Sequence, residues 1–513
     1  MEVDAERLPD GAQLEAALCI VGAGPAGIAL ARECGGRGVN VLLLESGGTE
    51  SEEWPQTLNE GTVAGDSYAG LRATRRRQAG GTSVLWNTGV SGVLGAKFTP
   101  LDPCDFEVSA EAAGLGWPLA RSDLEPFYRR AQRVCGLGSF QYEGAEWPGP
   151  ERSPLPIGGQ WLTTRIYQFG PQRLFTETYL SELRAAPAAR LCYHATVCEL
   201  IADGTGRRIV EARIGCRSGK RLSARAPVFV LAGGAIENAR LLLVSVGRRG
   251  TGLGNQHDWV GRCFMEHPRD QSLRLVPHSP DFFREAAFYN FHRARDGTII
   301  AGRLAPTEAT IRRHRLSNFS ITLLPRPGAS LSARGAGWIA RLGRAVRRQR
   351  GRARTVGDGW SELPEPAGRS NELHLLINLE QRPNPENRVV LGSAADALGM
   401  PRPRLQWRWR SEEQAELDRL RGLLADWLGG AVGGRVRIAG GREPDLNAHH
   451  HAGTTRMAPH ARLGVVDLDC RVHGTDNLYV TGASVLPSAG VANPTLTIVA
   501  LALRLADHLG SVL

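Results

Sequence analysis

Short apolar runs that end near glycines and lead into a helical pattern occur three times in the chain. The first is LCIV at 18–21, which leads into GAGPAG; a helix and a second apolar run, VNVLLLE at 39–45, follow. VFVL at 228–231 and NLYV at 477–480 have the same character. Continuous apolar runs are typical of strands buried on both faces of a sheet. The pattern therefore predicts one Rossmann-like sheet, to which the chain returns after long insertions.

The middle of the chain has a different pattern. Between about 275 and 440 there are strand-like runs such as SNFSITLLP, ELHLLINLEQ and NRVVLG, and a polar helix is predicted at 411–428. This pattern predicts a separate, sheet-based lobe. Closer to the N-terminus, a loop and then a helix are predicted at 117–138, with a cap near Ser122 and Asp123.

We therefore expect an α/β (α+β) protein of two domains, because 513 residues exceed what one hydrophobic core usually serves. The first domain would be Rossmann-like and discontinuous, and the second would be built on an antiparallel sheet. The predicted division is 1–95, 185–272 and 442–513 for the first domain, 96–184 for a connecting or lid segment, and 273–441 for the second domain.

The formal net charge of +10 raises the question of a nucleic-acid partner. Seven arginines and no acid occur at 341–354, and removing those seven charges from +10 leaves +3. A basic binding face over the whole protein is therefore not indicated, and we expect no nucleic-acid partner. Four of these arginines share one helical face, which favours a solvated surface segment, with an anionic partner or a membrane contact as the alternative.

The ends of the chain and its cysteines bear on its location. Residues 1–11 are polar and acidic, unlike a signal peptide. No uninterrupted apolar run reaches 18 residues, so no membrane span is expected. The nine cysteines are scattered and never spaced CxxC, which is typical of reduced thiols. These features lead us to expect a cytoplasmic protein.

The first glycine-rich turn has the pattern of a dinucleotide site. In such a turn the first glycine permits a tight bend, the second lets backbone approach a pyrophosphate, and the third lets the helix pack on the strand. Here these are Gly22, Gly24 and Gly27, and Pro25 suits the first helical turn. Glu45 ends the next strand, where a carboxylate can accept hydrogen bonds from ribose hydroxyls. The turn alone does not distinguish FAD from NAD.

Two further segments could face a cofactor. The loop RRRQAGGTSVLWNTGVSG at 75–92 offers backbone amides and small hydroxyls to a flavin or a pyrophosphate, although any loop can have this composition. Near the C-terminus, Pro494 is predicted to open an apolar helix with Asn493 at the N-cap. Asn493 is then either a simple cap or part of a helix start that points at a cofactor edge that becomes anionic on reduction.

Three consecutive histidines, His449, His450 and His451, precede the sequence AGTTRM. Imidazole is both a common metal ligand and the usual general base near neutral pH. Neighbouring residues of a strand point to opposite faces, so the three rings do not converge on one ion, and no cysteine or carboxylate cluster accompanies them. A single catalytic base is the favoured interpretation, with a solvated loop and a metal site as alternatives. We expect no metal.

Taken together and in this order, the motifs resemble those of the glucose-methanol-choline (GMC) family of FAD-dependent alcohol oxidases and dehydrogenases. They are GAGPAG with Glu45, GGTSVLWN, WPLARSDLEPFY, VLAGGAIENARLLL, VGRCFMEHP, EQRPNPENRVVLG, HHHAGTTRM and NLYVTGASVLPSAGVANPTLTIVALALR. The EQRPNPENRV run is most similar to the bacterial branch that oxidises sugars and aminoglycosides. The region from about 275 to 370 carries almost no signature, and in this family that region shapes the substrate pocket.

The resemblance implies a fold of the GMC and FAD-linked reductase type, and a set of site residues. The family's catalytic histidine stands three residues before the glycine of H-x-x-G-T, which is His450 here, and its second catalytic member falls on Asn493. Some sugar oxidases bind the flavin covalently through a histidine where this chain has Leu85, so non-covalent FAD is implied. The implied substrate contacts are His449, Gln381 and His451. The implied cofactor contacts are Gly22, Gly24, Pro25, Ala26, Gly27, Glu45, Ser46, Gly80, Gly81, Thr82, Ser83, Trp86, Asn87, Val197, Ala232, Gly233, Gly482, Ala483, Asn493, Pro494 and Thr495.

The resemblance also implies a reaction: oxidation of an alcohol of a polyhydroxylated small molecule, with hydride to the flavin N5, the proton to His450, and dioxygen or another carrier as electron acceptor. The favoured substrate is the primary 6'-hydroxyl of an aminoglycoside intermediate of antibiotic biosynthesis, since Glu443 and Asp445 could meet a cationic amine. The alternative is a secondary hydroxyl of a neutral pyranose or C-glycoside. A nicotinamide-dependent reductase fits the first 48 residues, and a nucleic-acid binder rests only on the arginine segment.

Overall fold

The computed structural model describes residues 1–86, 88–90, 93–107, 114–147, 152–157, 159–246, 250–326, 371–439, 444–445, 448–491 and 493–513. Asn87, Glu443 and the arginine-rich segment 341–354 lie outside these residues. The predictions made for them therefore stay predictions.

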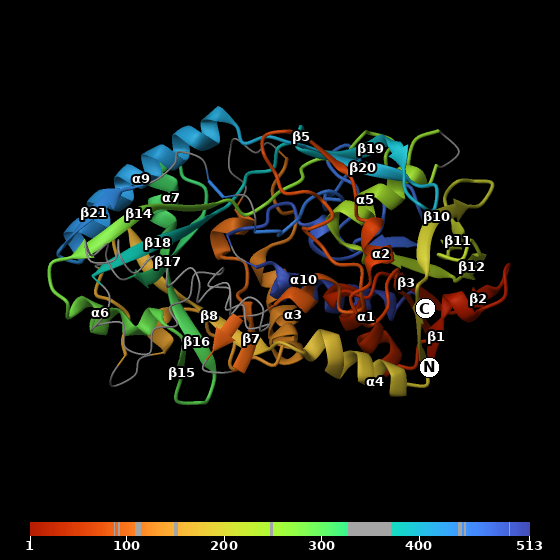
Figure 1. Ribbon diagram of the computed structural model, residues 1–513, viewed down its shortest axis with the longest axis horizontal. Coiled ribbons are helices and arrows are strands. Elements are labelled where there is room, and N and C mark those ends of the chain that lie inside the picture. The colour runs from red at the N-terminus through yellow and green to blue at the C-terminus, as the bar shows by residue number, and fades with distance from the viewer. Residues whose placement is uncertain are drawn as a thin grey trace, which may run out of the picture.

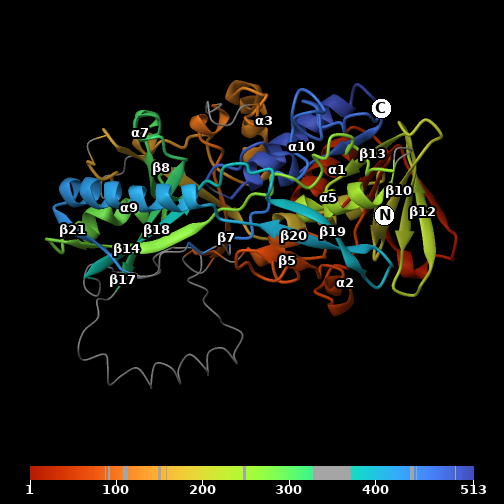
Figure 2. The ribbon, with the colours of Figure 1, turned by 90° about the horizontal axis from the view of Figure 1, so that it is seen from above.

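The molecule is elongated, with a parallel sheet and its helices at one end and a large antiparallel sheet at the other (Figures 1 and 2). In the described residues the parallel sheet has six strands in the order β1-β9-β4-β3-β13-β22. These strands are β1 (Glu2–Asp4), β3 (Leu18–Val21), β4 (Val41–Leu44), β9 (Ala189–Tyr193), β13 (Val228–Leu231) and β22 (Leu478–Val480).

The parallel sheet joins segments that are far apart in the sequence. Leu18 pairs with Val41 on one side and with Val228 on the other, and Leu231 pairs with Val480. The strands β4, β13 and β22 are buried along their whole length, as their continuous apolar sequences predict. The prediction of one Rossmann-like sheet with long insertions is thus confirmed.

Helices pack around this sheet in layers. Helix α1 (Pro25–Gly36) contacts α10 (Thr495–Leu509), which in turn contacts α3 (Arg121–Val134), and α5 (Gly234–Val244) follows β13. The other α-helices of the described residues are α2 (Glu53–Thr57), α4 (Tyr179–Ala185), α6 (Phe282–Glu285), α7 (Glu308–His314) and α9 (Ser411–Ala431). None of the helices in the described part of the chain combines the length and the apolar character that a membrane span requires.

Two predicted helix starts are wrong by one or two residues. Helix α3 begins at Arg121, so Ala120 is the N-cap, and Asp123 accepts a hydrogen bond from the Ala120 N–H at 2.8 Å from within the first turn. Helix α10 begins at Thr495, with Pro494 in the cap position. A one-residue shift is within the usual uncertainty of a helix boundary, but it changes what Asn493 does.

The antiparallel sheet holds nine strands in the described residues, in the order β21-β14-β18-β17-β16-β8-β7-β6 with β15 beside β16. Helix α9 lies along it and contacts β14 and β21 (Figure 2). The strands are β6 (Thr88–Val90), β7 (Val93–Phe98), β8 (Leu162–Pro171), β14 (Arg269–Pro277), β15 (His292–Arg293), β16 (Ile299–Pro306), β17 (Phe319–Arg326), β18 (Glu372–Leu379) and β21 (Gly434–Ile438).

The predicted connecting segment 96–184 contributes strands to this antiparallel sheet, since β7 pairs with β8 and β8 pairs with β16. The domain limits proposed from the sequence stay a prediction. Two smaller sheets complete the described structure, in the orders β10-β11-β12-β2 and β19-β20-β5. Their strands are β2 (Gln13–Glu15), β5 (Thr62–Gly65), β10 (Thr196–Ala202), β11 (Ile209–Gly215), β12 (Arg221–Arg225), β19 (Arg388–Ala395) and β20 (Pro401–Trp407).

Candidate active site

The first glycine turn has the geometry that a bound dinucleotide needs. Gly22 has a left-handed φ of 107°, and a Cβ there would lie 2.7 Å from the carbonyl oxygen of Ala232. A Cβ on Gly27 would lie 2.0 Å from the Gly22 carbonyl oxygen, so this glycine lets α1 pack against the turn. At Gly24 a Cβ would meet nothing within 4 Å. Protein packing therefore does not require a glycine there, and the open space before α1 suits a pyrophosphate.

Glu45 follows β4 and is 7% exposed. Its two carboxylate oxygens accept hydrogen bonds from the N–H groups of Ala23 and Gly47, each at 2.9 Å. Burial raises the pKa of the Glu45 carboxyl, and these amide bonds oppose that rise. Each carboxylate oxygen can accept a second hydrogen bond, and Glu45 lies on the cavity wall. The carboxylate can therefore receive ribose hydroxyls, as the sequence predicts.

The second glycine loop closes over the first. The Gly80 N–H donates to the carbonyl oxygen of Ala23 at 2.8 Å, and a Cβ on Gly81 would lie 3.0 Å from the Cα of Gly24. One turn of 3-10 helix, Gly81–Leu85, follows, and the Ser83 hydroxyl donates to the Gly80 carbonyl at 2.6 Å. The two glycine loops are thus in contact, and both face the same space.

A cavity of about 460 Å³ extends along both glycine loops and reaches His450 and Asn493. Its size is within the roughly 300–1,000 Å³ usual for small-molecule and cofactor sites. Leu85 lies on its wall and offers no nucleophile to a flavin. Gly27 and Gly80 support the wall without lining it, and Asn87 lies outside the described residues. The predicted cofactor contacts on the wall are Gly22, Gly24, Pro25, Ala26, Glu45, Ser46, Gly81, Thr82, Ser83, Trp86, Val197, Ala232, Gly233, Gly482, Ala483, Asn493, Pro494 and Thr495.

The three consecutive histidines separate into two environments. Backbone hydrogen bonds between Met265 and Ala452, of 3.0 and 3.1 Å, hold the histidine segment beside the residues that precede β14. His450 contacts Asn493, whereas ring nitrogens of His449 and His451 approach a carboxylate on the other side. His449 also has a left-handed φ of 58°, which is rare for a residue with a Cβ.

His450 is held as a neutral acceptor. The Asn493 amide nitrogen, which can only donate, lies 2.9 Å from Nε2 of His450, so Nε2 carries no proton. Burial lowers the pKa of His450 well below its usual value, and the neighbouring His267 and Lys97 lower it further. The ring is therefore neutral near neutral pH, and its Nε2 beside the cavity carries no proton.

The side-chain carbonyl oxygen of Asn493 indicates whether this residue is a simple helix cap or part of a helix start that faces the cofactor. This oxygen is buried and has no hydrogen-bond partner among the residues that the structure describes. It does not accept a hydrogen bond from an amide of α10, so the cap interpretation is not supported. A buried acceptor without a partner is costly, and a hydroxyl or imide N–H of a bound ligand would satisfy it.

A buried carboxylate lies behind the histidine row. One oxygen of Glu266 lies 2.5 Å from the Tyr68 hydroxyl, which in turn lies 2.9 Å from Nε2 of His451. The other oxygen accepts hydrogen bonds from the backbone N–H groups of His450 at 3.0 Å and His267 at 3.2 Å. Burial raises the pKa of Glu266 to about 7, against the lowering effect of these bonds. Glu266 thus supports the backbone of the predicted base.

This cluster also contains the elements of a metal site. Glu266, His449 and His451 place one ligand atom each within 4.8 Å of one another. No cysteine or carboxylate cluster accompanies the histidines in the sequence, but in the fold one carboxylate, that of Glu266, lies beside two of them. The Tyr68 hydroxyl already bonds to two of the three groups, so hydrogen bonds account for this arrangement. The expectation that the protein holds no metal stays a prediction.

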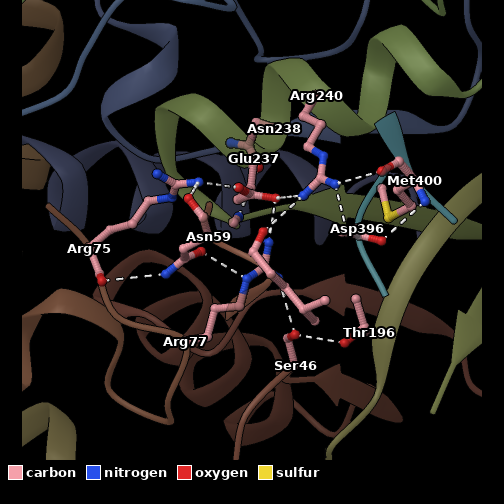
Figure 3. Close-up of polar contacts among 12 residues, drawn as sticks. Ser46, Asn59, Arg75, Arg77, Thr196, Glu237, Asn238, Arg240, Asp396 and Met400 are labelled. Atoms are coloured by element: carbon pink, nitrogen blue, oxygen red, sulfur yellow. Dashed lines mark hydrogen bonds and ion pairs between the residues drawn. The ribbon is translucent and has the colours of Figure 1, made fainter. Parts of the chain in front are cut away.

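An ion network borders another part of the cavity (Figure 3). Glu237 of α5 lies 2.7 Å from Arg75, 2.5 Å from Arg77 and 3.3 Å from Arg240. Burial would raise the pKa of Glu237, but the three guanidinium groups outweigh it and hold the pKa far below its usual value. Arg77 also donates to the Ser46 hydroxyl at 3.1 Å, next to Glu45. The network thus connects α5 with the end of β4, where a ribose is expected.

The structure separates the three predicted substrate contacts. His449 and His451 lie on the cavity wall. Gln381 is buried behind Glu266, where its side-chain oxygen accepts hydrogen bonds from the Glu266 N–H at 3.0 Å and from Trp407 at 3.3 Å. Sequence reasoning missed Glu266 and its neighbours, and the polar run MEHP inside VGRCFMEHP was the signal that could have indicated them.

Comparisons with known proteins bear on the kind of protein that has this cavity. Residues 383–502 match a family described as GMC oxidoreductase. The chain is 24% identical over 564 residues to 6'''-hydroxyparomomycin C oxidase of Streptomyces lividus, covering 96% of this chain and 92% of the relative. It is 24% identical over 580 residues to the fructose dehydrogenase large subunit of Gluconobacter japonicus, covering 96% and 97%. The crystal structure of pyridoxine 4-oxidase from Mesorbium loti has a similar fold, with a TM-score of 0.55 and 17% identity over 97% of this chain and 99% of that chain. The resemblance to the GMC oxidoreductases found in the motifs is thereby confirmed, and the protein is an FAD-dependent alcohol oxidoreductase.

Proposed function

We propose that this protein oxidises a hydroxyl group of a sugar-like substrate and that His450 takes the hydroxyl proton. The observation that carries the proposal is the pair of His450 and Asn493 on the cavity wall, 2.9 Å apart, with no proton on Nε2 of the imidazole. Bound FAD supplies the hydride acceptor that oxidation of an alcohol needs. The glycine loops, Glu45 and Ser46 would hold it along the cavity.

The residues near His450 suit the charge changes of this reaction. Nε2 of His450 would accept the hydroxyl proton, a contribution of about 10²–10⁴ in rate for a positioned base. The substrate hydroxyl would take the place of the Asn493 amide at Nε2, and the amide N–H would then donate to the developing alkoxide, an effect worth about 3 kcal/mol for comparable donors. Lys97 and Arg269 also lie on the cavity wall and act electrostatically on His450, so they favour negative charge there.

The same charges discriminate between two substrate classes. Similarity to 6'''-hydroxyparomomycin C oxidase supports an aminoglycoside as the substrate, while similarity to the fructose dehydrogenase large subunit supports a neutral sugar. Asp445, which could have met an amine, is paired with Arg269 at 2.7 Å. Among the described wall residues, the carboxylates are Glu45 and Glu237, both in the nucleotide part.

A polycationic substrate would therefore approach Lys97 and the ion pair of Arg269 with Asp445 at the reacting end of the cavity, and its approach to Lys97 costs electrostatic free energy. Of the two candidates, the cavity favours a neutral pyranose or C-glycoside, and the aminoglycoside rests on the relative alone.

Anaerobic mixing of the holoenzyme with neutral pyranoses, C-glycosides and aminoglycosides tests both parts of this proposal. A substrate bleaches the visible absorbance of the flavin, and we expect neutral sugars to do so faster than aminoglycosides. The His450→Ala variant should retain FAD and be reduced about 100-fold more slowly. Reduction of this variant at the wild-type rate would show that His450 is not the base. Admitting air to the reduced enzyme then shows whether dioxygen or another carrier is the electron acceptor.

A further inference from the structure

His267 precedes β14, is 1% exposed and uses both of its ring nitrogens. Its Nδ1 lies 2.8 Å from Nδ1 of His450, and its Nε2 lies 3.1 Å from the carbonyl oxygen of Ala489. A carbonyl can only accept, so Nε2 of His267 carries the proton. Burial lowers the pKa of His267 to about 4, so the ring is neutral. Its Nδ1 is therefore an acceptor.

The direction of the next hydrogen bond follows from this assignment. Because Nδ1 of His267 accepts, the proton in the contact between the two rings must lie on Nδ1 of His450. Nε2 of the neutral His450 then carries no proton. The Asn493 amide, which donates to Nε2 at 2.9 Å, requires the same tautomer independently. The bonds on both sides of His450 thus agree.

The carbonyl group of Ala489, which accepts the hydrogen bond from His267, lies in a segment that is itself held in place. Ser488, the residue before Ala489, donates through its hydroxyl to the carbonyl oxygen of Asp105 at 3.0 Å. The same hydroxyl lies 3.1 Å from the indole N–H of Trp117, which donates to it. Both Ser488 and Ala489 are buried. These two hydrogen bonds fix the position of the residue before Ala489.

We propose that His267 is a positioning residue that holds His450 in the tautomer whose Nε2 is free to accept a proton. The proposal rests on the proposed role of His450 as the base. A neutral imidazole can carry its proton on either nitrogen, and only one tautomer presents a lone pair to a substrate hydroxyl. The arrangement resembles the group behind the histidine of a catalytic triad, with one difference. His267 is neutral, so it orients His450 without the negative charge that would stabilise an imidazolium.

Two substitutions of similar polarity separate the functions of the two ring nitrogens of His267. Asparagine places its side-chain oxygen close to the position of Nδ1, so His267→Asn keeps an acceptor for His450. Glutamine places its amide close to the position of Nε2, so His267→Gln keeps a donor for Ala489 and leaves His450 without its acceptor. We expect anaerobic flavin reduction within about 5-fold of wild type for the first variant and about 100-fold slower for the second, in line with the loss of comparable orienting partners. KM should change little in either, and both should retain FAD.

Nitrogen chemical shifts of ¹⁵N-histidine-labelled protein provide a readout that needs no substrate. The signals of His450 are identified as those missing from the His450→Asn variant. Wild type and His267→Asn should show a proton on Nδ1 and a free Nε2, and His267→Gln should show both tautomers. Equal rates in the two His267 variants, or an unchanged His450 tautomer in His267→Gln, would overturn the proposal. If His450 is not the base, the His450→Ala rate shows it, while the nitrogen shifts still report whether His267 selects the tautomer.

Discussion

The side chain of Asn493 should affect the rate mainly through its N–H donor. Its amide N–H donates to His450, while its carbonyl oxygen is buried without a partner. Asn493→Ser keeps a donor, whereas Asn493→Asp puts a carboxylate beside the developing alkoxide. We expect kcat/KM to fall about 10-fold in the serine variant and at least about 100-fold in the aspartate variant. Steady-state rates give the comparison, and thermal unfolding of both variants is the control. Full turnover in both would mean that Asn493 takes no part in the reaction.

His450 should keep the enzyme active on the acid side of the usual imidazole range. Burial lowers its pKa well below 6.5, and His267, Lys97 and Arg269 lower it further. The base must be neutral, so kcat/KM stays high at pH 6.5 and falls only as the pH drops through this lowered pKa. A profile of kcat/KM against pH measures this lowered pKa. An acidic limb centred at or above pH 6.5 would contradict the assignment.

The control for this profile is Glu266→Gln. Burial raises the pKa of Glu266 to about 7, and its carboxylate accepts a hydrogen bond from the His450 backbone. Its ionisation could therefore add a second step near neutral pH. The substitution should remove any such step and leave the acidic limb of His450 in place.

At this scale, the sequence predicted the residues that belong to local motifs. His450 and Asn493 follow from short patterns, and the structure brings these two residues into contact. His267 and Glu266 were not assigned roles, because their roles depend on hydrogen bonds to a residue 183 or 184 positions away. No local periodicity encodes such a contact. Gln381 was assigned to the substrate from a resembling motif, but its buried contacts are with Glu266 and Trp407.

At the scale of elements, a buried ion pair fastens α9 to the antiparallel sheet. Arg421 of α9 contacts Asp270 of β14 through two hydrogen bonds of 2.8 and 3.2 Å, and the two side chains are 4% and 3% exposed. Removing Asp270 takes the buried counterion from Arg421, which keeps the more exposed Asp418 at 2.7 Å. Asp270→Ala should therefore lower the free energy of unfolding by about 3–5 kcal/mol, measured with urea on the FAD-loaded protein.

Two controls accompany this prediction. Replacing the whole pair, as in Asp270→Leu with Arg421→Met, should restore most of the stability, because no buried charge is then left unpaired. Asp476→Ala removes an exposed ion pair with Arg207 and should change stability little. If Asp270→Ala unfolds at the same urea concentration as Asp476→Ala, the buried pair does not hold the helix to the sheet.

Whether a segment forms a helix or a strand was easier to predict than where it begins and ends or which strand it pairs with. Apolar runs such as VLLL at 41–44 are buried strands because only burial on both faces favours such a sequence. The starts of α3 and α10 were misplaced because Asp123 caps from within the helix and Pro494 occupies the cap position. The pairing of β8 with β16 joins residues more than 100 positions apart, and such pairings leave no local trace.

At the scale of the whole molecule, the cavity connects parts of the chain that fold far apart in sequence. Its wall includes Gly22 near the N-terminus, Val197 and Ala232 in the middle, and Thr495 near the end. A cofactor that contacts all of them binds only the folded chain. Binding should therefore stabilise the entire protein, by about 2.7 kcal/mol when free FAD is at 100 times its Kd.

Substitutions at two glycines of the first turn should separate the stabilisation by FAD from the stability of the apoprotein. A Cβ at Gly24 meets no protein atom within 4 Å, so Gly24→Ala should leave the unfolding temperature of the apoprotein unchanged and remove most of the increase that FAD causes. A Cβ at Gly27 would lie 2.0 Å from the Gly22 carbonyl oxygen, so Gly27→Ala should lower the unfolding temperature even without FAD, at a cost of about 1–3 kcal/mol or more. Thermal unfolding of both variants, each with and without FAD, gives the four unfolding temperatures. A Gly24→Ala variant that gains as much from FAD as wild type would mean that the pyrophosphate does not lie against the start of α1.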